Sequence, residues 1–184
     1  GDGTLQRISL NKNGTEQDRV RSEIFFSVED DPIFDKPVKV GDSWELISFE
    51  GNIFNATEDN QEISISEPWS IKGEGDSGWK VGGTQIMAIH KDLDLLFVVM
   101  HQGGVDTHEQ PGNEIWIFNR GSHQRIARLS TESLINSLMV TQTANPKLIL
   151  SRATEPMVDV YDIKTLKKEH TIHAGQNVGL LLPY

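Results

Sequence analysis

The chain has 184 residues, enough for a sizeable hydrophobic core, and its 17 basic and 27 acidic side chains leave a formal charge of −10. Such a surface disfavours nucleic acid and anionic membranes as partners, because phosphate groups are bound through clustered Lys and Arg. The absence of cysteine excludes disulfides and thiolate chemistry, and no apolar run approaches the roughly 20 residues of a membrane-spanning helix.

Short runs of β-branched and aromatic residues at period two, separated by turn residues, predict an all-β fold. Helical periodicity is nearly absent, and even the candidate at residues 132–140 is better interpreted as extended chain. The first five strands are expected at residues 4–10, 19–27, 44–49, 53–56 and 62–67. The next five are expected at 85–90, 95–101, 114–119, 124–129 and 137–141. The last four are expected at 147–152, 158–162, 168–173 and 178–182.

The strands repeat along the chain. The segment EIWIFNRGSHQRIARL at 114–129 aligns without a gap on MVDVYDIKTLKKEHTI at 157–172. Each segment predicts a strand, a turn after Asn119 or Asp162, and an outer strand of alternating polar and apolar residues. Four strands recurring at this spacing are typical of the blades of a β-propeller.

The length is sufficient for about four blades, whereas closed propellers have roughly 4 to 8. We expect a single β-propeller segment of four-stranded antiparallel blades. Residues 1–30 would form the outer strands of a partial blade, 31–83, 84–133 and 134–176 three further blades, and 177–184 a closing strand. The chain begins directly on a turn and a strand, which indicates the C-terminal part of a larger ring.

The segment MHQGGVDTHEQPGNEIWIF, at residues 100–118, raises the question of a metal or catalytic site because it places two histidines among three carboxylates. These side chains are His101, Asp106, His108, Glu109 and Glu114. Metal ligands on one rigid element come at closer, fixed spacings, such as i and i+4 in a helix. The glycines and prolines of this segment instead indicate a long connection. A loop or interface is therefore the favoured interpretation, and an adventitious or functional metal stays an alternative.

The equivalent connection in the next repeat, residues 153–156, is short, so the segment from 102 to 113 is an insertion. Long insertions on a rigid scaffold are common places for binding. We therefore expect a subunit interface there. The candidate residues in this loop are His101, Gln102, Asp106, His108 and Glu109.

The four tryptophans are interpreted as core or interface residues. Trp69 and Trp79 flank the segment IKGEGDSG and complete the set of candidate interface residues, because interfaces are rich in tryptophan. The pair Asp30-Asp31 could indicate acid–base chemistry or a calcium site. However, adjacent residues of an extended chain point to opposite faces, so a turn is the favoured interpretation.

Several segments together resemble one family. FSVEDDPIF (26–34), PWS (68–70), GWKVGG (78–83) and MHQGGVDTH (100–108) followed by residues 114–129 resemble the heavy subunit of quinone-dependent amine dehydrogenases. The first, second and fourth segments look closer to the aromatic amine dehydrogenases than to the methylamine dehydrogenases. The resemblance covers essentially the whole chain and matches the C-terminal half of that subunit. Glu109 and Asn119 depart from it, because these positions commonly carry a basic residue and an aspartate. Asn and Asp serve a turn similarly, so the second departure has little functional weight.

The resemblance implies a seven-bladed heavy subunit, present in two copies with two light subunits in the bacterial periplasm. The cofactor, tryptophan tryptophylquinone, and the catalytic base would belong to the light subunit. Primary amines would be oxidised to aldehyde and ammonia, and electron transport would continue to a small copper protein or a cytochrome. For this chain the resemblance implies a structural and docking role, with no cofactor, metal or catalytic residue of its own.

Two alternatives remain open from the sequence. The chain could be a non-enzymatic β-propeller scaffold that binds proteins. It could also be a propeller hydrolase with a metal in its central channel, which requires polar ligands at the inner-strand ends of several blades. Only His90 and Glu45 lie near such positions.

Overall fold

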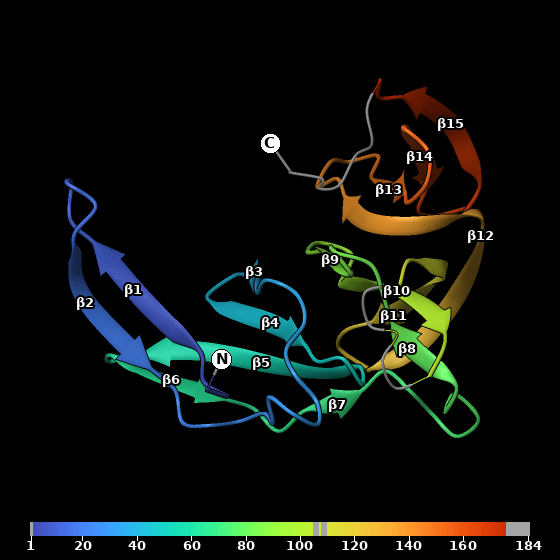
Figure 1. Cartoon of the computed structure of the whole chain (residues 1–184). Coiled ribbons are helices and arrows are strands. Elements are labelled where there is room, and N and C mark those ends of the chain that lie inside the picture. Colours follow the sequence, from blue (N-terminus) through green and yellow to red (C-terminus); the bar gives the residue numbers. More distant parts are fainter. Residues whose placement is uncertain (1, 105–106, 108–109, 176–184) are drawn as a thin grey trace. The chain divides into compact units, whose positions relative to one another are not determined.

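The computed structural model describes residues 2–104, 107 and 110–175. All regular elements among these residues are β-strands in antiparallel ladders, which confirms the all-β prediction (Figure 1). The chain divides into two compact units, residues 1–70 and 71–184, and each is described by itself. No helix among the described residues is long and apolar enough to cross a membrane.

The first unit contains a two-stranded hairpin and a five-stranded sheet with the order β3-β4-β5-β6, in which β7 pairs with β5 (Figure 1). The hairpin strands are β1 (Gln6–Leu10) and β2 (Glu16–Arg21). The sheet strands are β3 (Val38–Val40), β4 (Ser43–Ile47), β5 (Asn52–Asp59), β6 (Glu62–Ile65) and β7 (Trp69–Ser70). The core of this unit includes Leu46, Phe54, Ala56 and Ile63, and Val20 of the hairpin packs with them.

The second unit is one continuous sheet with the order β15-β14-β13-β12-β11-β10-β8, to which β9 adds by pairing with β10. Its first strands are β8 (Trp79–Val81), β9 (Met87–His90), β10 (Leu95–Gln102) and β11 (Gly112–Asn119). They are followed by β12 (Gln124–Val140), β13 (Lys147–Arg152), β14 (Met157–Asp162) and β15 (Lys168–His173).

The structure differs from the expected strands at several places. The strands expected at 124–129 and 137–141 form the single long strand β12, because the residues between them contain no Gly or Pro and the ladder passes directly from β11 to β13. The short strands β3 and β8 were not expected, since three residues are too few to establish a period. The strand expected at 178–182 lies outside the described residues.

The expected strand at 19–27 is also shifted, to 16–21, because Ser22 ends the ladder. Its hydroxyl accepts a hydrogen bond from the backbone N–H of Leu5 and donates to the carbonyl of Glu23. The expected blade boundaries at residues 30, 83, 133 and 176 remain predictions, and the one at 133 falls inside β12.

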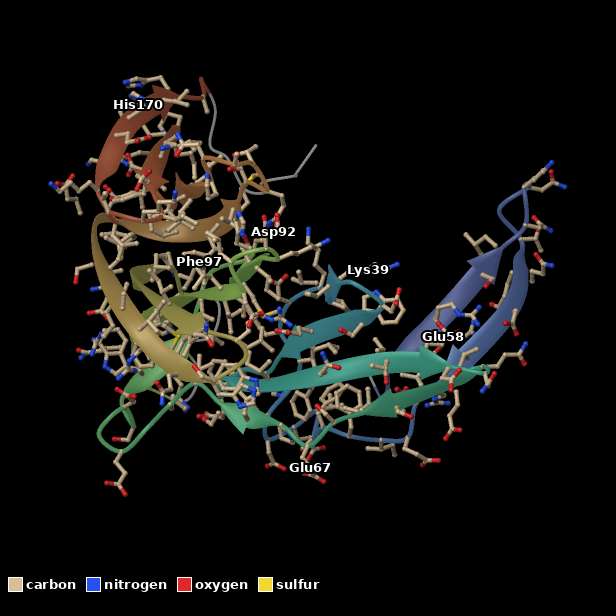
Figure 2. All side chains as sticks on the ribbon, turned by 180° about the vertical axis from the view of Figure 1, so that it is seen from behind. Lys39, Glu58, Glu67, Asp92, Phe97 and His170 are labelled. Carbon is tan, nitrogen blue, oxygen red and sulfur yellow. The ribbon has the colours of Figure 1, made fainter. Side chains whose placement is uncertain are left out.

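The central strands β10 and β11 are buried on both faces. Phe97, Val99, Ile115 and Ile117 belong to the main core cluster, and Phe97 lies in the interior of this unit in Figure 2. The alternate residues between them, including Trp116, are buried on the other face of the sheet. Burial on both faces explains why these strands are nearly continuous apolar runs rather than alternating ones.

The turns of the sequence repeat have matching side-chain hydrogen bonds. Oδ1 of Asn119 accepts a hydrogen bond of 2.8 Å from the N–H of Ser122. Oδ1 of Asp162 accepts the N–H groups of Lys164 and Thr165 at 3.0 and 2.9 Å. Both side chains therefore stabilise their turns by accepting backbone N–H groups.

The hydrogen bonds to the carboxylate of Asp162 are expected to make the stability of the chain depend on pH. The N–H of Thr165 and the ammonium group of Lys147 both hydrogen-bond the carboxylate and lower the pKa of Asp162 from 3.8 to about 2. Because the folded pKa lies below the unfolded one, this stabilisation is present above about pH 4 and is lost as the pH falls through about 2. We expect Asp162→Asn to flatten the pH dependence of the unfolding free energy in this window.

Urea unfolding followed by circular dichroism at pH 2 to 5 measures this effect. Asp42→Asn, at an exposed position, is the control and should preserve the wild-type profile. The same profile for Asp162→Asn and the wild type would contradict the role of this carboxylate.

Candidate functional site

The connection between β10 and β11, residues 103–111, is the long insertion that the sequence predicts, whereas residues 153–156 alone join β13 to β14. Of the candidate interface residues in or beside this connection, His101 and Gln102 form the end of β10. Asp106, His108 and Glu109 lie outside the described residues.

His101 is a buried anchor for this connection. Its side chain is 4% exposed, and Nδ1 lies 3.1 Å from the carbonyl oxygen of Gln102. Because a carbonyl only accepts hydrogen bonds, Nδ1 carries the proton in this contact. A Cβ atom built on Gly82 would lie 2.5 Å from Cδ2 of His101, and one built on Gly103 would lie 2.8 Å from Cε1. The ring therefore fits between two residues without side chains.

A cavity of about 390 Å³ lies beside His101 at this end of the sheet. Its lining includes the side chains of Gln102, Gln110 and Asn113 together with Leu134, which is 45% exposed. Amide groups beside an apolar side chain can both donate and accept hydrogen bonds to a partner surface. Among the described residues, no group of three or more His, Asp or Glu side chains is arranged to hold a metal ion.

Trp79 lies on β8, opposite Gln102 in the strand register, so the structure brings it near the end of β10. Its ring is buried and lies 5.4 Å from the ring of Trp116. Trp69 belongs to β7 of the first unit, where it is half-buried and pairs with Ile53. The structure thus groups three of the seven candidate residues, His101, Gln102 and Trp79.

Two arginines of β12 cover this pair of tryptophans, a feature that the sequence analysis missed. The guanidinium carbon of Arg125 lies 4.2 Å from the ring centre of Trp116, and that of Arg128 lies 4.7 Å from Trp79. Glu114 accepts a hydrogen bond of 2.9 Å from Nε1 of Trp116 and pairs with Arg128 at 2.6 Å. These contacts combine cation–π and ionic stabilisation on one face of the sheet.

Asp76 completes this network from the loop before β8. Its carboxylate contacts Arg125 at 2.9 Å and accepts the N–H of Gly73 at 3.0 Å. Burial by itself raises the pKa of Asp76, but these two contacts outweigh it and hold the pKa below its usual value. The loop is therefore fixed to β12 by an ionised carboxylate.

Asp30 and Asp31, the two acidic residues before Pro32, stabilise turns. Asp31 accepts hydrogen bonds of 2.7 Å from the backbone N–H of Glu50 and from the side-chain amide of Asn52. Asp30 accepts one of 2.8 Å from the hydroxyl of Ser27. The two carboxylates have separate partners, as expected for a turn.

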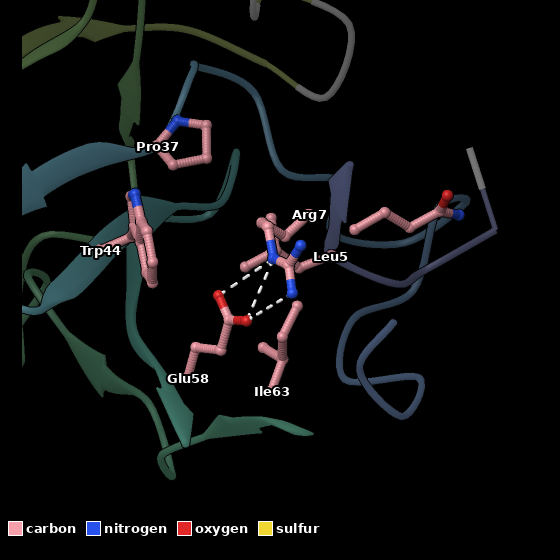
Figure 3. A pocket seen from close by; sticks show the side chains of 7 residues that line it. Leu5, Arg7, Pro37, Trp44, Glu58 and Ile63 are labelled. Atoms are coloured by element: carbon pink, nitrogen blue, oxygen red, sulfur yellow. Dashed lines mark hydrogen bonds and ion pairs between the residues drawn. The ribbon is translucent and has the colours of Figure 1, made fainter. Parts of the chain in front are cut away.

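A second cavity, of about 280 Å³, lies in the first unit between β1 and the sheet (Figure 3). Leu5, Trp44 and Ile63 form apolar walls, and Arg7 and Glu58 contribute charged groups. Oε1 of Glu58 accepts hydrogen bonds from Nη2 and Nε of Arg7 at 2.8 and 3.0 Å. Because the two charges neutralise each other, this cavity presents apolar surface rather than a reactive group.

Comparison with known proteins identifies relatives over nearly the whole chain. The chain is 26% identical over 171 residues to the methylamine dehydrogenase heavy chain of Methylobacillus flagellatus, covering 91% of this chain and 42% of that protein. It is 24% identical over 177 residues to the heavy chain of Methylorubrum extorquens, covering 94% and 42% respectively. The chain thus spans less than half the length of the curated relatives that it matches.

Among solved structures, the WD40 domain of Neurospora crassa Pan2 superposes with a TM-score of 0.55 at 12% identity, covering 94% of this chain and 44% of that domain. At this identity the similarity supports the β-propeller fold alone. The model of the methylamine dehydrogenase heavy chain family matches residues 1–178. The chain therefore belongs to the methylamine dehydrogenase heavy chain family.

Proposed function

We propose that this chain is the C-terminal part of the heavy subunit of an amine dehydrogenase, with a structural role and a role in docking the light subunit. The family match over residues 1–178 carries this proposal. The light subunit would contain tryptophan tryptophylquinone and the catalytic residues. The heavy chain would contribute a rigid sheet and the surfaces that hold the light subunit.

The β10–β11 connection is the proposed docking element. It joins two strands whose central residues are buried on both faces, and the adjoining residues His101 and Gly112 are buried as well, so its two ends are held by the sheet. The buried His101 and the cluster of Trp79, Trp116, Arg125 and Arg128 support the sheet beneath it. A connection whose two ends are fixed loses less conformational entropy on binding than one with free ends, which favours association.

The substrate would be a primary amine, oxidised to aldehyde and ammonia. Four curated relatives are named methylamine dehydrogenase heavy chains. The segments at 26–34, 68–70 and 100–108 favour an aromatic amine for this protein instead. Electrons would pass from the quinone to a small copper protein or a cytochrome in the periplasm, and the assembly would contain a second heavy subunit.

Co-purification with the light subunit tests this function. The full-length heavy chain, expressed with its light subunit, should elute as one complex with the visible absorbance of a quinone. Addition of an aromatic primary amine such as 2-phenylethylamine should bleach this absorbance, and methylamine should do so less efficiently. A heavy chain that elutes without a chromophore-bearing partner would contradict the proposal. Faster reduction by methylamine would overturn only the aromatic preference.

A further inference from the structure

The edge of β1 that faces away from β2 pairs with no strand among the described residues, because these two strands form a sheet by themselves. At one end of the hairpin the carbonyl of Leu5 accepts the N–H of Ser22 at 2.9 Å, and at the other the N–H of Asn11 donates across the turn at 2.9 Å. The direction of the backbone polar groups alternates along an antiparallel strand. The N–H and carbonyl groups of Gln6 and Ile8 therefore point away from β2, along the free edge.

The two edges of the hairpin differ in their side chains. β2 has the sequence EQDRVR, in which five of the six side chains are polar. Charged side chains on an edge strand discourage further pairing. β1 instead carries Ile8 and Leu10, which are 44% and 60% exposed. The edge of β1 is therefore the one at which a further strand is favoured.

The sheet beneath the hairpin indicates where that strand would lie. Its order is β3-β4-β5-β6. Arg7 of β1 is bonded to Glu58 of β5 at 2.8 Å, and Val20 of β2 shares a core cluster with Ile63 of β6. The two hairpin strands thus cover β5 and β6. A third strand, about 5 Å beyond β1, would cover β4.

The cavity of about 280 Å³ lies at this position (Figure 3). Trp44 of β4 and Pro37 are on one side of it, and Leu5 and Arg7 are on the other. None of the described residues that line it belongs to β2, so the cavity is on the free side of β1. An apolar cavity of about 150 Å³ can hold benzene, so this one has room for an aliphatic or aromatic side chain.

We propose that an extended segment of the heavy subunit, outside these 184 residues, pairs with the free edge of β1 and places an apolar side chain in this cavity. The inference rests on the proposed role of the chain as part of a heavy subunit. The chain covers 42% of two curated relatives, so more than half of such a subunit would be available to supply the strand. A two-stranded hairpin is marginally stable by itself, and main-chain hydrogen bonds to an added strand would stabilise it.

Hydrogen exchange of the full-length heavy chain, without the light subunit, tests this pairing when single residues are resolved by mass spectrometry. Gln6 and Ile8 lie opposite Arg21 and Arg19 in the strand register, so each pair compares the two edges of one hairpin. After correction for intrinsic rates, we expect the N–H groups of Gln6 and Ile8 to exchange at least about 10-fold more slowly than those of Arg21 and Arg19.

Trp44→Ala tests the cavity in the same measurement. Loss of the surface beneath the added strand should speed exchange at Gln6 and Ile8. The N–H groups of Arg7 and Ser9, which point toward β2, should keep their rates. Trp44→Phe retains an aromatic surface and is the matched control, so it should preserve the wild-type pattern.

Fast exchange at Gln6 and Ile8 in the full-length heavy chain would overturn the proposal. Slow exchange that appears only after addition of the light subunit, or only at high protein concentration, would assign the edge to that partner or to a second copy and would also overturn it. Unchanged exchange in Trp44→Ala would contradict the role of the cavity. Because the heavy chain is measured alone, a failure to bind the light subunit, which contradicts the proposed function, leaves this test unaffected.

Discussion

Trp116→Ala is expected to lower the unfolding free energy of the heavy chain by about 3–5 kcal/mol, the usual cost of truncating a buried aromatic side chain. Trp116 is fully buried and contacts the rings of Trp79 and Phe118. The substitution would also remove the indole N–H that Glu114 accepts and the ring surface beneath Arg125. Urea unfolding monitored by circular dichroism measures the loss.

Ile126→Ala is the control for this substitution, because Ile126 lies on the neighbouring strand β12 and is 57% exposed. We expect it to change the unfolding free energy by less than about 0.5 kcal/mol, as is usual for exposed positions. A loss below about 1 kcal/mol for Trp116→Ala would show that the tryptophan–arginine cluster does not stabilise the sheet.

Gly82→Ala is expected to displace the end of the β10–β11 connection and to destabilise the chain by about 1–3 kcal/mol, the usual cost of overpacking. A Cβ atom at this position would lie 2.4 Å from the carbonyl oxygen of Gln110 and 2.5 Å from Cδ2 of His101. The first contact is with backbone, so rotation of one side chain cannot relieve it. Both unfolding free energy and light-subunit affinity should fall.

Gly104→Ala provides the matched control within the same connection, because a Cβ atom there would meet nothing within 4 Å. It should retain wild-type stability and affinity in the same two assays. Equal behaviour of the two alanine variants would contradict the close packing described around His101.

Strands with a clear run of apolar residues were predictable from the sequence. The apolar runs that became β10, β11, β13 and β14 are long enough to show their period, and turn residues separate them clearly. The length of β12 was not predictable, because continuity of a ladder depends on which strands pair on either side. Such pairing is a tertiary property that local patterns do not contain.

The candidate site was predictable only in part, for a similar reason. The loop and the end of β10 follow from the comparison of two repeats within one chain. The position of the two arginines over the tryptophans could not be predicted from the sequence. Arg125 and Arg128 are three residues apart, so they would point to opposite faces of a regular strand. A register shift opposite Ile117 and Phe118 places Arg128 across from Trp116 and Arg125 across from Phe118, so that both reach the same face. The close approach of Gln110 to Gly82 likewise depends on the folded loop.

Shortening the β10–β11 connection tests most directly whether this chain docks a light subunit there. In the test variant an Asn-Gly turn replaces residues 104–109, which leaves β10 and β11 intact. Its affinity for the light subunit, measured by surface plasmon resonance, should fall at least about 10-fold, or 1.4 kcal/mol. Its unfolding free energy should stay near the wild-type value, and Thr154→Ala in the short connection of the next repeat should leave both quantities unchanged. A folded variant that binds the light subunit with wild-type affinity would contradict the proposed docking role.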